Sequence, residues 1–170
     1  TVSGCTGNNG TVSVIVNPIP GSPTPGSNSP ICAGSTLSLT ASAIAGATYN
    51  WSGPNSFTSS VQNPTIPGAS VLATGIYSVN VTVAGCTGTN STISVTVNPI
   101  PVLSSTQSPA AICSGTTFAY TATSATADAT FAWSRAAVAG ISEAAATGTG
   151  NVSETLTNTT TTAIDVVYSY

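Results

Sequence analysis

The sequence predicts an all-β protein built from two similar antiparallel β-sandwich modules, and three observations point to this fold. Val, Ile and Thr are abundant, and these residues suit strands. Short alternating stretches follow one another along the chain, separated by turns rich in Gly, Pro and Asn. Residues 2–20 and 83–101 match at 14 of 19 positions, with a constant offset of 81 and no gap. An internal match of this kind indicates two copies of one structural unit.

The first complete module is expected over residues 21–101. It follows a proline-rich segment, residues 17–26, which we interpret as a semi-rigid extended connector because prolines this dense cannot donate to a sheet. The predicted strands lie at 35–42, 47–53, 57–62, 64–67, 76–83 and 92–97, with a hairpin turn at 85–90. Short strands joined by regular turns over this length are typical of an antiparallel β-sandwich.

The second module is expected over residues 102–170 and repeats the same plan. Ile112-Cys113 matches Ile31-Cys32 at the offset of 81, and Phe131-Ala132-Trp133 resembles Tyr49-Asn50-Trp51. The Ala-rich stretch 135–147 has helical propensity. Its glycines and the surrounding strand pattern favour a β-hairpin instead.

The second module stops within a strand, and residues 1–20 carry the missing part. They are expected to contribute strands at 1–4 and 10–17 joined by a turn at 7–10. When residues 168–170 are followed by residues 1–5, the strand alternation and the Gly-Cys motif of the first module are reproduced without a shift. We therefore expect the second sandwich to be completed by residues 1–20 of the neighbouring copy. The expected junction between copies comprises Tyr168, Tyr170, Thr1 and Val2.

Two arrangements explain this permuted order. In one, the sequence is one period of a long covalent tandem array. In the other, separate subunits complete each other by strand addition. The covalent array is favoured, because a natural donor strand would start at a linker whereas the sequence here starts inside a strand. Either arrangement makes copies of the same sequence, joined head to tail, the expected partner.

The charge content excludes several classes of function. The chain has no His, one basic residue and four acidic residues, which are Arg135, Asp128, Glu143, Glu154 and Asp165. One cation gives no electrostatic surface for nucleic acid or for anionic lipid, and no apolar run is long enough to insert into a membrane. The acids are single and far apart in sequence, unlike calcium sites or glycosidase pairs. We expect no catalytic residue, no metal site and no cofactor.

Three aromatic residues are assigned to the core. Trp51 and Trp133 each lie on the third strand of a module, where a sandwich buries its central aromatic residue. A role as sugar-stacking platforms is the alternative. Tyr77 opens the penultimate strand, a common place for a tyrosine that fixes a corner of the sandwich.

The four cysteines, Cys5, Cys32, Cys86 and Cys113, indicate an oxidising, extracellular setting. Pairing Cys32 with Cys86 is favoured because each module carries one cysteine of each type, which leaves Cys113 to pair with Cys5 of the next copy. In an immunoglobulin topology, however, these positions lie at opposite poles, about 30 Å apart along the strand. A disulfide needs Cα atoms within roughly 7 Å, so staples between modules stay open as an alternative.

Four motifs form a recognisable pattern: residues 29–41, residues 53–60, the pair Gly75-Ile76-Tyr77-Ser78-Val79 and Gly85-Cys86-Thr87, and residues 97–101. In this pattern the chain resembles the Ig-like and PKD-like tandem repeat modules of giant cell-surface proteins of Bacteroidota, including adhesins of the gliding-motility type. The resemblance covers the whole chain, although residues 131–135 depart from the acidic motif that is typical of PKD domains.

The resemblance implies a structural repeat of an extracellular filament or cell-surface adhesin stalk, without enzymatic activity. A glycan or protein ligand would then be bound elsewhere in the full protein. A carbohydrate-binding or spacer module of a secreted polysaccharide-degrading enzyme is the alternative function. A donor-strand pilus subunit is the third.

Overall fold

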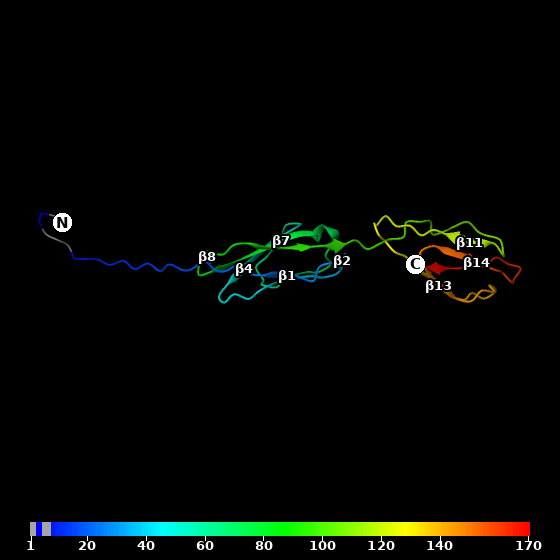
Figure 1. Ribbon diagram of the computed structural model, residues 1–170, viewed down its shortest axis with the longest axis horizontal. Coiled ribbons are helices and arrows are strands. Elements are labelled where there is room, and N and C mark those ends of the chain that lie inside the picture. The colour runs from blue at the N-terminus through cyan, green and yellow to red at the C-terminus, as the bar shows by residue number, and fades with distance from the viewer. Residues whose placement is uncertain (1–2, 5–7) are drawn as a thin grey trace. The chain divides into compact units, whose positions relative to one another are not determined.

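The computed structural model describes residues 3–4 and 8–170, and it is all-β apart from one short 3-10 helix at Val71–Ala73. The chain divides into two units, Thr1–Asn98 and Pro99–Tyr170, and the boundary falls in the second Asn-Pro-Ile-Pro motif. Both units consist of small sheets with antiparallel pairing throughout, except for one parallel pair (Figure 1). The predicted all-β sandwich class is confirmed.

Unit 1 contains the complete set of strands that the repeat predicts. One sheet has the order β5 (Phe57–Ser59), β4 (Thr48–Gly53), β7 (Gly75–Val83), with β8 (Cys86–Thr87) and β9 (Ser91–Val95) both pairing with β7. The other has the order β1 (Pro25–Ser27), β3 (Leu37–Ala41), β6 (Thr65–Ile66), and β10 (Val97–Asn98) pairs in parallel with β2 (Ile31–Cys32).

The sheets of unit 1 enclose one apolar core, because alternate residues of the longer strands point inward. The core members are Leu37, Leu39, Ala41, Tyr49, Trp51, Ala69, Ala73, Tyr77, Val79, Val81, Val95 and Val97. Trp51 is fully buried, and its Nε1 donates to the carbonyl oxygen of Gln62 at 3.2 Å. Tyr77 is also fully buried, and its hydroxyl donates to the carbonyl oxygen of Ala73 at 3.0 Å.

The proline-rich connector is shorter than the sequence predicts. Pro25–Ser27 forms β1 and pairs antiparallel with β3, with Pro25 opposite Ala41. A proline is tolerated here because it is the first residue of a strand at the edge of its sheet.

The strand predicted at residues 10–17 does not form within this chain. Residues 8–20 have no secondary structure, and Val12, Val14 and Val16 are 98%, 80% and 85% exposed. A lone segment cannot satisfy the backbone groups of a strand without a neighbour, and no ladder partner lies beside it among the described residues. The expected strand at 1–4 and turn at 7–10 fall partly on residues 1–2 and 5–7, which lie outside the described residues.

Unit 2 reproduces part of the same plan. Its sheets have the orders β11 (Thr117–Tyr120), β14 (Val152–Thr155) and β13 (Ala146–Thr149), β12 (Ala132–Arg135), β15 (Tyr168–Ser169). The Ala-rich stretch 135–147 is not a helix but the connection and adjoining strand ends of a β-hairpin, in which β12 and β13 pair antiparallel from Ala132 opposite Thr149 to Arg135 opposite Ala146. In unit 2, β12 and β15 correspond to β4 and β7 of unit 1.

Candidate functional site

The candidate site is the open side of unit 2. Strand β15 pairs with β12 along one edge, and no other strand in the described part of the chain pairs with its second edge. In unit 1 the corresponding edge of β7 pairs with β9. Strands β9 and β10 contribute two core residues to unit 1, Val95 and Val97, which are 1% and 3% exposed. Unit 2 has no counterpart of these two strands among residues 99–170.

The open side of unit 2 has an apolar groove, which we define by its aromatic side chains. Phe118 packs on Tyr168 with ring centroids 5.3 Å apart, and Tyr120 packs on Tyr170 at 5.6 Å. Two adjoining hollows of about 500 and 450 Å³ lie beside these rings, and Phe118 and Tyr168 line both. A groove of this size between the sheets of a small sandwich means that its core is not closed.

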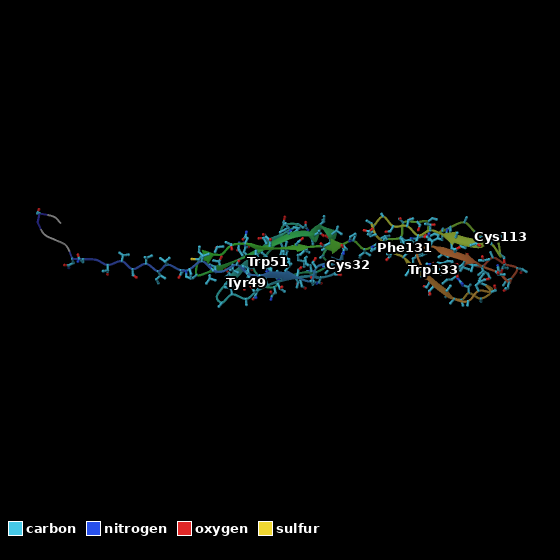
Figure 2. The ribbon with its side chains drawn as sticks, in the orientation of Figure 1. Cys32, Tyr49, Trp51, Cys113, Phe131 and Trp133 are labelled. Atoms are coloured by element: carbon cyan, nitrogen blue, oxygen red, sulfur yellow. The ribbon has the colours of Figure 1, made fainter. Side chains whose placement is uncertain are left out.

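The core of unit 2 is correspondingly less buried than that of unit 1. Figure 2 shows Tyr49 and Trp51 in unit 1, and Phe131 and Trp133 in unit 2. Trp51 is fully buried, but Trp133 is only partly buried, and Tyr170 is 38% exposed. Trp133 Nε1 is also the one buried side-chain nitrogen or oxygen atom without a hydrogen-bond partner among the described residues.

One charged pair contacts Tyr168 of this groove through Glu154, and the sequence did not predict it. Arg135 is 2% exposed, and its Nε and Nη2 donate to Glu154 at 2.9 and 3.3 Å. Nη2 also donates to the carbonyl oxygen of Ala144 at 2.6 Å. The hydroxyl of Tyr168 donates to the same carboxylate at 2.6 Å. The only basic residue of the chain therefore stabilises the fold of unit 2 and is not presented to solvent.

The electrostatics of this cluster follow from its hydrogen bonds. The hydrogen bond from Arg135 lowers the pKa of Glu154, and burial followed by the Glu154 contact raises the pKa of Tyr168. A second carboxylate, Glu143, accepts the Thr157 backbone N–H at 2.9 Å, which lowers the pKa of Glu143 to about 2. Both carboxylates are more acidic than free glutamate because the folded unit stabilises their charged forms.

Acid is expected to unfold unit 2 selectively. A carboxylate whose pKa is lowered by folding stabilises the fold at pH values above its unfolded pKa, about 4.3, and this stability is lost as the pH falls through the folded value. Glu143 and Glu154 therefore predict loss of stability in unit 2 between about pH 4 and 2. Residues 1–98 contain no Asp, Glu, Lys, Arg or His.

NMR spectra of the chain recorded from pH 7 to 2 would check this prediction. The amide signals of unit 2 should lose their dispersion in the acid range while those of unit 1 keep it. Equal loss in both units, or none in either, would contradict the assignment of the acid-sensitive charges to unit 2.

The cysteines do not form the disulfide that was favoured within the first module. Within the described part of the chain, Cys32, Cys86 and Cys113 form no disulfide. Cys32 lies in β2 and Cys86 in β8, which are at opposite ends of unit 1 (Figure 1). The nine residues of β7 span roughly 30 Å, far more than a disulfide can bridge. The expected pairing of Cys113 with Cys5 of the next copy stays a prediction, since Cys5 lies outside the described residues.

The remaining predicted site residues are placed as follows. Tyr168 and Tyr170 of the expected junction lie in the groove, and Thr1 and Val2 lie outside the described residues.

No group of three or more His, Cys, Asp or Glu side chains that could hold a metal ion occurs among the described residues. In the part of the chain that the structure covers, no helix has the length and apolar character required to cross a membrane.

Comparison with known proteins shows a family to which the first unit is similar. Residues 20–99 match the sequence model of a family described as "Ig-like domain CHU_C associated". This range spans the strands of unit 1, from β1 to β10. No curated protein matches the chain. The match confirms the resemblance to Ig-like modules of Bacteroidota surface proteins for residues 20–99.

An Ig-like domain of this type indicates a structural or surface module. The Ig-like domain family is generally non-catalytic, and CHU_C-associated domains are typical of cell-surface proteins. The family match brings no ligand-binding residue with it. The open groove of unit 2 is therefore the feature of this chain from which a specific function is best inferred.

Proposed function

We propose that this chain is a structural repeat unit of an extracellular filament or cell-surface adhesin stalk, in which copies join head to tail. One observation carries the proposal. The chain has an apolar groove with an unpaired strand edge in unit 2, and an unpaired apolar segment at residues 10–17. Two such features on one molecule allow each copy to contact a copy on either side, and contacts of this heterologous kind generate open strings.

The surface of the chain suits an exposed fibre. Only 3% of its residues are charged, and its single Arg is 2% exposed. The folded chain therefore offers no accessible Lys or Arg for trypsin-like cleavage. Trp51, one of the two residues that a sugar-binding module would use, is fully buried and has no ring face open to a ligand.

Sedimentation of the purified chain over a range of concentrations, with electron microscopy of the same samples, tests the proposal. A ladder of linear oligomers that lengthens with concentration is expected. A monomer at every concentration would overturn head-to-tail assembly. The mass of native material after boiling in reductant and denaturant then separates the two arrangements. A mass far above 16.6 kDa indicates the covalent array, and a band near 16.6 kDa indicates separate subunits.

A further inference from the structure

We propose that residues 10–17 of the next copy form the missing last strand of unit 2. This segment, which we call the donor strand, would lie along the free edge of β15 with Val12, Val14 and Val16 in the apolar groove. The inference rests on the proposed head-to-tail assembly and specifies the contact that makes it.

The first argument is the equivalence of the donor strand to β9 and β10. At the offset of 81, residues 10–17 correspond to 91–98. In unit 1 the equivalent valines, Val95 and Val97, are 1% and 3% exposed, whereas Val14 and Val16 are 80% and 85% exposed. The equivalent valines are therefore core residues in unit 1 and exposed at residues 10–17. The apolar area of these side chains favours transfer into a matching groove.

The second argument is the alternation along the donor strand. In unit 1, Thr92, Ser94 and Thr96 face solvent, and the residues between them point to the core. Their equivalents are Thr11, Ser13 and Ile15. Because side chains alternate with a period of two, a strand docked in this register puts all three valines on the groove side. In this register the side chain of Ile15 faces away from the groove, as that of Thr96 does from the core of unit 1.

The third argument is the register at the end of the strand. In unit 1, Val97 lies opposite Ile31 and Asn98 opposite Cys32 in a parallel pair. The repeat therefore places Val16 opposite Ile112 and Asn17 opposite Cys113. Ile112 is 43% exposed and lines the larger hollow, so its side chain is available for this contact.

The chain direction also fits. Asn98 is followed by Pro-Ile-Pro, which leads into unit 2, and Asn17 is followed by the same Pro-Ile-Pro, which leads into unit 1. The side chain of Asn17 donates to the carbonyl oxygen of Ala84 at 3.2 Å, so the end of the donor strand is already attached to unit 1 of its own copy. One type of linker would therefore connect every unit to the next.

The test compares Val14→Asp with Ile15→Asp in the full chain. The two side chains are adjacent, similarly exposed and belong to a segment without secondary structure, so both variants should fold as the parent chain does. Val14→Asp would bury a carboxylate without a partner, and we expect self-association to weaken roughly 100-fold or more. Ile15→Asp should associate within a few fold of the parent. Equal effects of the two changes would overturn the register.

A peptide of residues 8–20 provides a second readout in the Val14→Asp chain, whose groove is intact. Binding is measured by the change in tryptophan fluorescence, with a peptide carrying the same Val14→Asp change as its control. Binding of the parent peptide alone supports the groove assignment. If neither peptide binds, the donor strand does not occupy the groove.

The two readouts distinguish failure of this contact from failure of the proposed assembly. Polymers that persist unchanged in Val14→Asp would leave head-to-tail assembly standing and overturn the donor strand. A parent chain that stays monomeric but binds the peptide would support the groove assignment and overturn the proposed assembly.

Discussion

A chain extended beyond Tyr170 by a second copy of residues 1–20 should fold with unit 2 closed. The extension supplies the donor strand from within the same chain, at the phase that the repeat requires. Since its one groove is then filled, the extended chain should remain monomeric at concentrations where the parent chain forms strings. Unit 2 should also be more stable, because the groove residues gain buried apolar contacts and β15 gains a ladder partner.

The expected change is large for a unit of this size. One kcal/mol of added stability raises the unfolding midpoint of a domain of 60–100 residues by about 4–8 °C, and we expect the midpoint of unit 2 to rise by roughly 10 °C or more. Calorimetry measures it, with unit 1 as an internal reference. The matched control carries Asp in place of Val14 in the added segment. An equal rise in that control would contradict docking of the valines.

Glu154→Gln is expected to be the most damaging single change in unit 2. It leaves the guanidinium of Arg135, whose side chain is 1% exposed, without its anionic partner. Removing one member of a buried ion pair costs more than the pair contributes, because the remaining charge stays desolvated. We expect a loss of about 3 kcal/mol in the free energy of unfolding of unit 2, at the lower end of the usual range because Glu154 is 17% exposed.

Denaturant unfolding of unit 2 at pH 7 measures this effect. Asp165→Asn makes the same chemical change at an exposed carboxylate and serves as the control, with an expected effect within about 0.5 kcal/mol. Equal stability of Glu154→Gln and the parent would show that Arg135 finds sufficient compensation from the backbone carbonyl oxygens that it also contacts.

The core of unit 1 was predictable because it depends on local patterns. Alternating apolar residues on β3 and β7 placed Leu37, Leu39 and Val79 inside, and position along the sandwich placed Trp51 and Tyr77 there. These signals need only the period of a strand and the usual location of aromatic residues. The groove itself was predictable in outline, since the repeat showed which strands unit 2 lacks.

Other features depended on contacts that no local pattern encodes. The ion pair of Arg135 and Glu154 joins residues 19 positions apart in sequence. It forms between β12 and β14, which belong to different sheets of unit 2. Pro25–Ser27 becomes a strand because β3 offers a free edge, against the propensity of the segment. The disulfide within the first module was assigned by counting cysteines, which ignores the length of β7. The strand at 10–17 was expected from its own sequence, but a strand requires a neighbour.

Hydrogen exchange of residues 10–17 in assembled material tests the central claim most directly. In the single chain, this segment and the outer edge of β15 both lack a ladder partner among residues 3–4 and 8–170. If the donor strand completes unit 2, amides of the segment and of residues 166–170 should become protected together on assembly. Both should exchange rapidly in the Val14→Asp chain. Assembled strings in which residues 10–17 exchange as fast as in that variant would contradict the account.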